Sequence, residues 1–244
     1  MSVIKGKVAL ISGASRGIGR AIARKLASKD AKIVAVARNS NSLKELGRAL
    51  SEFNSESMAL PCDITQLDDC THVVQETIKR LGKIDILVNN AGVGYSGIIA
   101  ESNPAEVEEM FKVNLFGCYY MTRLVLPHMI QHRSGDIVNV GSIAGLKYSP
   151  GFAVYSATKF AIRAFTEALR NEVQDYDIRV ALINPGITRT SFYKSFAKHK
   201  SPVPVDKGDM LSPEDIAEAV YFMLTQPKGV ALNEITIRPN WQER

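Results

Sequence analysis

Hydrophobic residues occur along the chain in short runs of strand length, and these runs alternate with longer segments whose apolar residues recur every three to four positions. The first pattern is typical of buried strands, and the second of helices that cover a sheet with one face. Their alternation predicts an α/β fold with a doubly wound parallel sheet and helices on both of its faces. About seven strands are expected, at Val8–Ser12, Ile33–Ala37, Ser57–Pro61, Ile86–Asn89, Asp136–Val140, Arg179–Ile183 and Glu234–Arg238.

Capping residues mark several of the expected helix starts. Ser42 has Glu45 three residues later, whereas Asn103 and Ser212 each precede a proline. Such side chains accept hydrogen bonds from the free N–H groups of a first helical turn, where proline is also favoured. No linker-like run, internal repeat or low-complexity tract interrupts the pattern, so residues 1–244 are expected to form a single domain.

A glycine-rich turn follows the first expected strand. It contains Gly13, Gly17 and Gly19, and a helical pattern begins near Ala21. Glycine lets the backbone approach a pyrophosphate closely, and the N-terminus of a helix offers it free N–H groups. A strand, such a turn and a helix in this order predict nucleotide binding in a Rossmann-type fold.

A second group of reactive side chains lies in the middle of the chain. Tyr155 and Lys159 are one helical turn apart and would face the same way, and Ser142 precedes them. An adjacent ammonium favours the phenolate, which predicts a pKa of Tyr155 below its usual value of about 10. Such a tyrosine can exchange a proton with a substrate whose oxygen a serine hydroxyl holds. For the pair alone, a lysine beside a half-buried tyrosine is the structural alternative.

Taken together, the motifs from Lys7 to about Arg238 resemble those of the short-chain dehydrogenase/reductase family. Ser12 replaces the threonine with which the family's glycine motif usually begins. The other matches are, in chain order, Asn89-Asn90-Ala91-Gly92, Asn114, Ser142, Tyr155, Lys159 and Pro185-Gly186. The chain departs from the family at Gly141, where a serine is common, and at Thr188, where an aliphatic residue is usual.

The resemblance implies reversible hydride transfer between a nicotinamide cofactor and a carbonyl or alcohol group, in which Tyr155 is the general acid. Lys159 would lower the pKa of Tyr155 and bind the nicotinamide ribose, while Ser142 would hold the carbonyl oxygen. Asn114 would anchor a water molecule that passes protons to Lys159. Without the resemblance, an asparagine in an apolar helix could equally satisfy a neighbouring backbone group.

The end of the second expected strand indicates which dinucleotide would bind. A site selective for NAD usually has a carboxylate there for the adenosine 2′-hydroxyl, but Arg38 follows this strand. Arg38 and Arg16 of the glycine turn could together bind the 2′-phosphate of NADP, which a carboxylate would repel. Exposed surface charge is the alternative for each arginine alone. NADP(H) is therefore the expected cofactor, and reduction the expected direction.

The resemblance also supplies the remaining cofactor contacts. Asp63 would contact the adenine, and Thr190 would reach the nicotinamide end. Asn90 and Gly92 would line the ribose and pyrophosphate region. The complete expected set is Gly13, Ser15, Arg16, Gly17, Ile18, Gly19, Arg38, Asp63, Ile64, Asn90, Ala91, Gly92, Tyr155, Lys159, Pro185, Gly186, Thr188 and Thr190.

The segment after Pro185-Gly186 covers the substrate in this family, which predicts a substrate lid at about residues 187–210. The segment is aromatic and basic. Aromatic side chains facing inward would suit an apolar carbonyl compound, and lysines at the mouth an anionic one, whereas a solvated helix is the alternative. The residues concerned are Phe192, Tyr193, Phe196, Lys198 and Lys200, with Tyr95, Tyr148 and Phe152 expected to flank the pocket.

The substrate itself is open to two interpretations. One is a small diffusible ketone, aldehyde or 3-hydroxy acid. The other is a 3-oxoacyl thioester on an acidic carrier protein, which the basic lid would dock. The ending Leu232–Pro239 lacks the Gly-Gly common among oxoacyl reductases and favours the first. A non-catalytic NADP(H) sensor is a remote third interpretation, because such relatives typically lose the tyrosine or the lysine.

The segment from Met110 to Ile130 is apolar on nearly all helical faces, which predicts burial inside the fold or against another copy. Because family members often form dimers and tetramers, a homodimer or homotetramer is expected.

Composition indicates the cellular compartment and excludes some classes of ligand. The net charge of +5 is too thinly spread to indicate nucleic-acid binding, and no apolar run approaches the length of a membrane span. No signal-peptide pattern precedes the first strand. Cys62, Cys70 and Cys118 lack the spacing of a metal or disulfide framework. A cytoplasmic protein with no metal site is therefore predicted.

Overall fold

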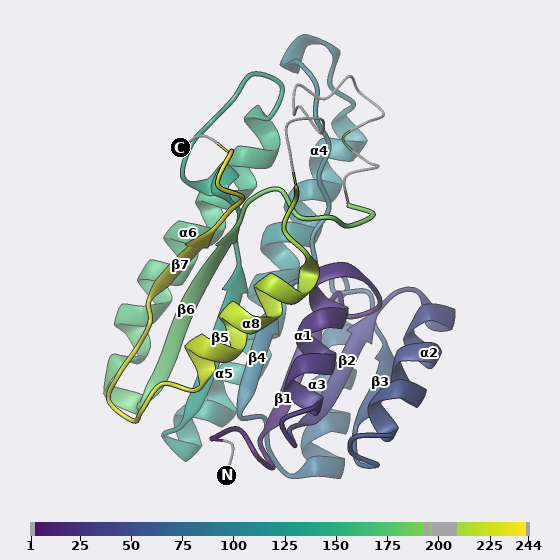
Figure 1. Ribbon diagram of the computed structural model, residues 1–244, viewed down its shortest axis with the longest axis vertical. Coiled ribbons are helices and arrows are strands. Elements are labelled where there is room, and N and C mark those ends of the chain that lie inside the picture. Colours follow the sequence, from purple (N-terminus) through teal and green to yellow (C-terminus); the bar gives the residue numbers. More distant parts are fainter. Residues whose placement is uncertain (1–2, 193–195, 197–208, 243–244) are drawn as a thin grey trace.

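A computed structural model describes residues 3–192, 196 and 209–242. In this part of the chain, seven parallel strands form one sheet in the order β3-β2-β1-β4-β5-β6-β7 (Figure 1). Their bounds are β1 (Val8–Ser12), β2 (Lys32–Ala37), β3 (Met58–Pro61), β4 (Ile86–Asn89), β5 (Gly135–Val140), β6 (Ile178–Pro185) and β7 (Glu234–Ile237). The expected fold class and every expected strand are confirmed, with end positions that differ by at most two residues.

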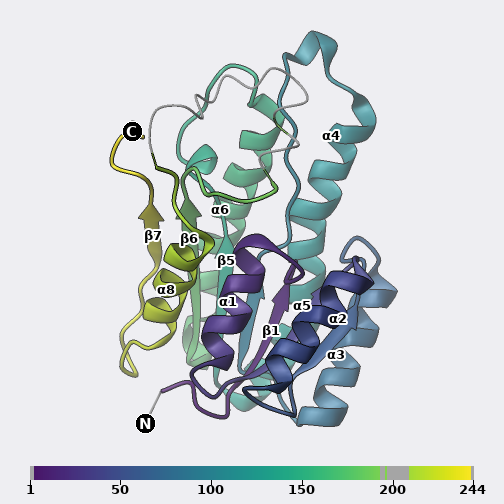
Figure 2. The ribbon, with the colours of Figure 1, turned by 45° about the vertical axis from the view of Figure 1, so that its right-hand side comes forward.

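Helices cover both faces of the sheet, and each face has its own apolar core. α1, α2 and α8 pack against one face, and α3, α5 and α6 against the other (Figure 2). The strands supply both cores because successive side chains point to opposite faces. In β1, Ala9 and Ile11 join the first core, and Val8 and Leu10 join the second. The α-helices are α1 (Gly17–Ala27), α2 (Ser40–Ser51), α3 (Leu67–Leu81), α4 (Pro104–Phe111), α5 (Gly117–His132), α6 (Ala153–Val173) and α8 (Pro213–Leu224).

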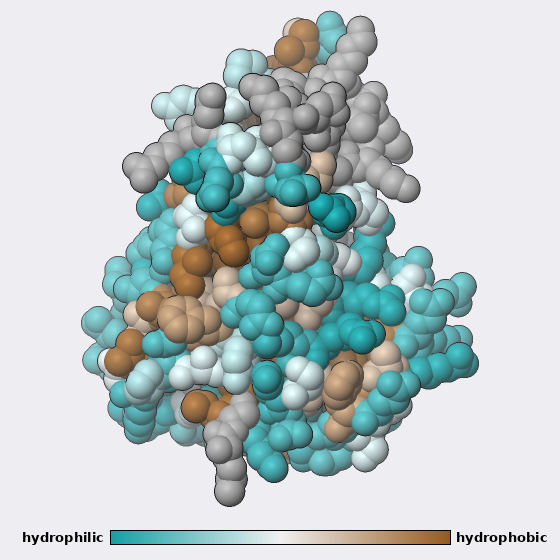
Figure 3. All heavy atoms as spheres, viewed as in Figure 1, coloured by the Kyte–Doolittle hydropathy of each residue, from teal (hydrophilic) through white to brown (hydrophobic). Residues whose placement is uncertain are grey.

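Because the apolar faces of the helices pack on the sheet, the surface is mostly polar. Figure 3 shows a mainly hydrophilic face, crossed in its upper middle by a band of apolar residues. No helix in the described part of the chain is long and apolar enough to cross a lipid bilayer.

The strand order reverses between β1 and β4. In a doubly wound sheet, the chain leaves the carboxyl ends of two such neighbouring strands toward opposite faces, which opens a crevice for a ligand. Here the glycine turn follows β1 and Asn90 follows β4, so both motifs lie at that crevice.

Two of the three expected helix caps are confirmed. The side chain of Asn103 accepts a hydrogen bond from Ala105 N, and Ser212 forms a reciprocal capping box with Asp215. The prediction that Ser42 begins a helix is wrong. Helix α2 begins at Ser40, because Asn39, two residues after β2, accepts the hydrogen bond from Ser42 N at 3.0 Å.

The apolar segment 110–130 is not one regular helix. α4 ends at Phe111, a π-helical turn spans Lys112–Phe116 (η2), and α5 continues from Gly117. A π turn widens the helix locally and is frequent at functional sites. Within this segment Phe116 and Tyr119 remain 48% and 42% exposed, so the fold itself leaves part of its apolar surface uncovered.

Candidate active site

A cavity of about 780 Å³ opens at the carboxyl ends of the strands. That volume is within the range that accommodates organic ligands and cofactors. Among the expected site residues, all except Gly19 and Asn114 line this cavity. The structure therefore brings together side chains that the sequence separates by more than 170 positions, from Gly13 to Thr190.

The floor of the cavity is a hydrogen-bonded junction between β1 and β4. The hydroxyl of Ser12 accepts hydrogen bonds from Asn90 N at 3.0 Å and Ala91 N at 3.1 Å. In return, Asn90 Nδ2 donates to the carbonyl oxygens of Ser12 at 2.9 Å and Gly13 at 3.2 Å. Serine thus supplies the hydroxyl that the usual threonine would supply, and Asn90 supports the glycine turn.

The glycines are required by close packing at this junction. Gly13 has a φ of +66°, and a Cβ there would lie 2.7 Å from Ala91 Cα. A Cβ at Gly19 would collide with Asn90 Nδ2. Gly19 was expected to contact the cofactor, but it lies beneath the turn rather than in the cavity wall. It allows helix α1 to approach the β4 end closely.

The start of α1 is shaped for a phosphate group. Arg16 precedes the helix in an extended conformation (φ −157°, ψ 172°), and its side chain makes no capping hydrogen bond within the described structure. The first backbone N–H groups of α1 are therefore available to an anionic ligand. This uncapped helix end, next to a turn that has no room for a Cβ, fits the pyrophosphate of a dinucleotide.

Positive charge is concentrated near the end of β2. Arg38 and Arg16 line the cavity together, and both are exposed at its edge. Asp63 is the one acidic residue among the described residues of the wall. Its Oδ1 accepts hydrogen bonds from both the backbone N and the hydroxyl of Thr65, at 3.0 and 2.8 Å. An anionic group at the Arg38 edge would therefore meet two cations, while one oxygen of the single carboxylate in the described wall is engaged by Thr65.

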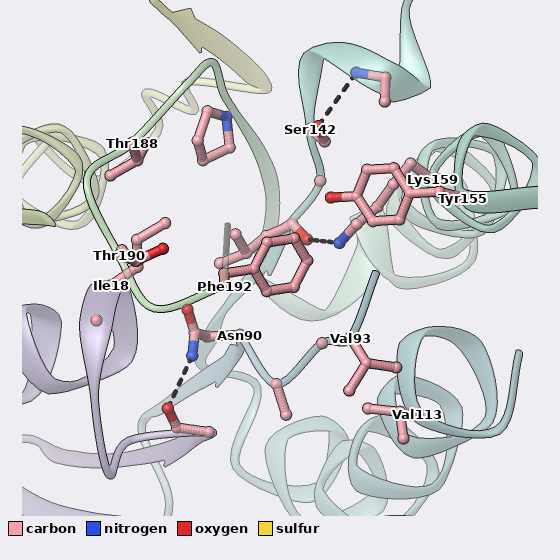
Figure 4. A pocket seen from close by; sticks show the side chains of 18 of the residues that line it. Ile18, Asn90, Val93, Val113, Ser142, Tyr155, Lys159, Thr188, Thr190 and Phe192 are labelled. Atoms are coloured by element: carbon pink, nitrogen blue, oxygen red, sulfur yellow. Dashed lines mark hydrogen bonds between the residues drawn. The ribbon is translucent and has the colours of Figure 1, made fainter. Parts of the chain in front are cut away.

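Tyr155, Lys159 and Ser142 meet on the opposite wall. Tyr155 and Lys159 lie in α6 and are 7% and 6% exposed. Lys159 Nζ lies 5.8 Å from the centre of the Tyr155 ring and donates a hydrogen bond to the carbonyl oxygen of Val140 at 3.0 Å. Ser142 follows β5, and its hydroxyl accepts a hydrogen bond from Ala144 N at 3.1 Å. Figure 4 shows these side chains across the cavity from Thr188, Thr190 and Ile18.

The electrostatics of this group differ from the expectation. Burial raises the pKa of Tyr155 to about 12, and a hydrogen bond with Ser142 only partly opposes the shift. Burial also lowers the pKa of Lys159 to about 8. The prediction that Lys159 lowers the pKa of Tyr155 is therefore wrong for this structure, because burial raises that pKa and the ammonium of Lys159 donates its hydrogen bond to Val140 instead. The tyrosine is neutral and holds its proton across the physiological range.

Residues 7–201 match the family of short chain dehydrogenases. The chain belongs to this family of oxidoreductases.

Relatives cover the dehydrogenase almost completely. An uncharacterized oxidoreductase of Staphylococcus aureus is 35% identical over 239 residues, which are 98% of this chain and 100% of the relative. The closed form of a serine dehydrogenase complexed with NADP+ superimposes with a TM-score of 0.91 at 31% identity, over 97% of this chain and 96% of that one. The 3-ketoacyl-(acyl-carrier-protein) reductase from Brucella melitensis, complexed with NADH, gives a TM-score of 0.86 at 32% identity, over 96% and 97% of the two chains.

Gly141, one of the dehydrogenase's departures from its family, has a local structural cause. A Cβ at Gly141 would collide with Asn184 Oδ1 and would lie 3.1 Å from Leu182 Cδ1. Asn184 is held in place because its Nδ2 donates to Glu234 Oε1 at 2.7 Å. The asparagine on β6 therefore occupies the space that a serine before Ser142 would need.

Asn114 has a structural role in the dehydrogenase. Within the π turn, its Oδ1 accepts from Val93 N at 2.8 Å, and its Nδ2 donates to Val93 O at 2.9 Å and to Thr158 Oγ1 at 3.0 Å. The side chain thereby ties the backbone after Gly92 to α6, on which Tyr155 and Lys159 lie. The anchoring of a water molecule by Asn114 stays a prediction.

Aromatic side chains cover the Tyr155 side of the cavity. Phe192 and Phe196 line it, with ring centres 6.0 and 5.3 Å from that of Tyr155. Gly94 makes room for both, since a Cβ there would lie 2.5 Å from Phe196 and 2.9 Å from Phe192. For these two phenylalanines the structure therefore has the inward orientation and not the alternative of a solvated helix. Tyr193, Lys198 and Lys200 lie outside the described residues.

Of the three aromatic residues expected to flank the pocket, one lines the cavity and two do not. Phe152 lines the cavity, whereas Tyr95 and Tyr148 do not. Tyr148 lies in the loop before α6 and is 83% exposed, and its ring centre is 6.5 Å from that of Phe160. Tyr95 packs behind the wall against the cluster that contains Met110 and Tyr155.

Sequence reasoning missed the C-terminal part of the wall. Trp241 and Gln242 line the cavity. Gln242 Oε1 accepts a hydrogen bond from Ile187 N at 2.9 Å, and Trp241 Nε1 donates to Asp209 O at 2.9 Å. Only the tertiary fold brings these residues to the Pro185-Gly186 turn, and no local pattern signals it. Among the described residues, no group of three or more His, Cys, Asp or Glu side chains could hold a metal ion.

Proposed function

We propose that this dehydrogenase reduces a ketone or aldehyde to an alcohol, reversibly, with NADP(H) as the hydride carrier. The observation that carries the proposal is the shared cavity. Tyr155, Ser142 and Lys159 line one wall of it, and an uncapped helix start with two arginines lines the other. The NADP+ complex of the similar serine dehydrogenase supports the same cofactor.

The residues of the chain divide the chemistry between them. The nicotinamide supplies or accepts the hydride when it is bound. Tyr155, neutral at physiological pH because its pKa is about 12, gives its proton to the carbonyl oxygen. The hydroxyl of Ser142 holds that oxygen, and Lys159, when charged, stabilises the tyrosinate that remains. In the oxidative direction the same groups act in reverse.

The cofactor end is held by backbone and cations. The N–H groups at the start of α1 would bind the pyrophosphate, and Arg16 and Arg38 the 2′-phosphate. Asp63 and Ile64 would border the adenine. Thr188 and Thr190, after the Pro185-Gly186 turn, would face the nicotinamide.

A small carbonyl compound is the favoured substrate, and residues 187–210 would form the lid over it. The apolar cover of Phe192 and Phe196 suits such a substrate. A 3-oxoacyl thioester is the alternative, because the acyl-carrier-protein reductase of Brucella melitensis is similar over nearly the whole chain. The absence of Gly-Gly in the ending Leu232–Pro239 favours the smaller compound.

The dehydrogenase would act as a homodimer or homotetramer. Exposed aromatic residues support this proposal. Phe116 lies directly before α5 and Tyr119 on it, while Phe160 lies on α6 and Tyr148 in the loop before α6. Such clusters of exposed apolar side chains are typical of interfaces between copies.

The test is NADPH consumption by the wild type and by Tyr155→Phe, with ketones, aldehydes, keto acids and an acetoacetyl thioester as substrates. The variant is expected to lose about three orders of magnitude in kcat, since it lacks the proton donor, while it still binds NADPH. Tyr148→Phe, an exposed tyrosine, is the matched control and should retain full activity. Preferential turnover of the thioester would replace the small-carbonyl proposal. Equal behaviour of wild type and Tyr155→Phe, with cofactor bound, would indicate the sensor.

A further inference from the structure

A carboxylate behind the cavity wall faces the arginine that would bind the 2′-phosphate. Glu109 in α4 places Oε1 3.7 Å from Nη1 of Arg38. Its other oxygen, Oε2, accepts a hydrogen bond from the hydroxyl of Tyr95 at 2.6 Å. Arg38 lines the cavity, whereas Glu109 does not, so the carboxylate can influence a bound cofactor chiefly through Arg38.

The two contacts of Glu109 are unequal. The 2.6 Å bond to Tyr95 has the length of a charge-assisted O–H···O⁻ bond, whereas 3.7 Å to Arg38 is beyond hydrogen-bond range. The side chain of Arg38 is 58% exposed, so solvent screens its ion pair. Burial and the charge of Glu109 raise the pKa of Tyr95 to about 12, which keeps the tyrosine a donor. The carboxylate is therefore held by Tyr95, while Arg38 is free to turn.

We propose that Glu109 is a specificity-determining residue that weakens the binding of NADP(H) relative to NAD(H). The inference rests on the proposed use of NADP(H) by this site. A 2′-phosphate must draw the Arg38 guanidinium away from Glu109, and it then lies near a negative charge that Tyr95 keeps in place. A 2′-hydroxyl carries no charge and meets neither penalty. Glu109 thus reduces the preference for NADP(H) over NAD(H) that Arg16 and Arg38 create.

The test compares the Kd values of NADPH and NADH, measured by titration of cofactor fluorescence, for the wild type and two charge variants. Glu109→Gln keeps an acceptor for Tyr95 but removes the charge, and its Kd for NADPH is expected to fall about three- to tenfold. Its Kd for NADH should stay within about twofold, and the effect should shrink at 1 M salt. Glu108→Gln is the matched control, because Glu108 is on the same helix but pairs with Lys112 at 2.9 Å.

A second variant tests the part played by Tyr95. Tyr95→Phe releases Glu109 from its position, so NADPH should bind more tightly than in the wild type. This gain in affinity should be smaller than that of Glu109→Gln. Combining Tyr95→Phe with Glu109→Gln should give no further gain, because both act on one interaction.

Each outcome decides something. Equal tightening by Glu108→Gln and Glu109→Gln would assign the effect to net charge and overturn the inference. Weaker NADPH binding by Glu109→Gln would show that the carboxylate orients Arg38 for the phosphate, and would overturn it too. An unchanged Kd, with NADPH bound normally by the wild type, would overturn this inference alone. A wild type that does not bind NADPH would instead contradict the proposed function.

Discussion

The two ends of the cavity are built by different means. The cofactor end consists mainly of backbone: a glycine turn after β1, an uncapped helix start and the Ser12–Asn90 junction. The substrate end consists of side chains, with Phe192 and Phe196 against Tyr155. Few residue types can replace those that set the backbone geometry of the glycine turn, whereas many apolar residue types can form the aromatic wall.

We expect this difference to make the two ends of the cavity respond differently to substitution. The turn requires glycine at set positions, because an added Cβ collides with neighbouring atoms. The junction requires a hydroxyl at Ser12, because it accepts the hydrogen bonds from Asn90 N and Ala91 N. The aromatic wall requires only apolar volume. Changes at the cofactor end should therefore abolish binding, and changes at the substrate end should adjust it.

Gly13→Ala is expected to have the largest effect. The new Cβ would lie 2.7 Å from Ala91 Cα at a φ of +66°, so both a collision and backbone strain arise. We expect a loss of about 3 kcal/mol in the free energy of unfolding, and at least a hundredfold weaker NADPH binding. Urea denaturation and cofactor titration measure the two.

Gly82→Ala is the matched control for that prediction. Gly82 also has a positive φ, of +77°, but nothing lies within 4 Å of its added Cβ. Gly82→Ala should lose about 1 kcal/mol in the free energy of unfolding, and its NADPH binding should be unchanged. If the two variants lost the same stability, the collision with Ala91 would not contribute.

The sequence predicted the cofactor end well because its signals are local. A strand, a glycine turn and a helix start are contiguous, and the strand order brings Asn90 to them. The contiguous motif did not distinguish Gly13, which lines the cavity, from Gly19, which lies beneath it. That distinction depends on how closely α1 approaches Asn90, which is a tertiary property.

At the Tyr155 end, local signals indicated the proposed catalytic residues but not their pKa values. The i, i+4 spacing placed Tyr155 and Lys159 correctly on α6. It could not reveal that both would be nearly fully buried, or that Val140 would accept the hydrogen bond from Lys159. Trp241 was missed for the same reason, since its place in the wall depends on contacts across the whole fold.

Lys159→Met should show what burial of the ammonium costs the fold. Because burial lowers the pKa of Lys159 in the folded state to about 8 from its ordinary value of 10.5, the charged lysine destabilises the folded protein below pH 8. The penalty disappears as the pH rises from 8 to 10.5, since the unfolded state then binds more protons. At pH 7 the variant should therefore have an advantage over the wild type in the free energy of unfolding. This advantage should fall by about 1–3 kcal/mol between pH 7 and pH 10.

Urea denaturation of both proteins at several pH values measures this difference. The variant loses the hydrogen bond to Val140 at every pH, so that loss cancels in the pH dependence. A difference that stayed constant from pH 7 to pH 10 would contradict the lowered pKa. The variant should also lose activity, because the tyrosinate left after proton transfer would have no cation nearby.

Phe196→Leu should have the smallest effect and should be confined to the substrate end. The ring of Phe196 packs edge-on against Tyr155, with centres 5.3 Å apart. Leucine keeps the site apolar but leaves part of the Tyr155 ring uncovered, so KM for the carbonyl substrate should rise about three- to tenfold. NADPH should bind within about twofold of the wild type, because the cofactor end is untouched. Phe222→Leu, at a phenylalanine 55% exposed on α8, should change neither quantity. Equal losses of carbonyl and NADPH binding in Phe196→Leu would mean that the aromatic wall also supports the cofactor end, and the contrast between the two ends would fail.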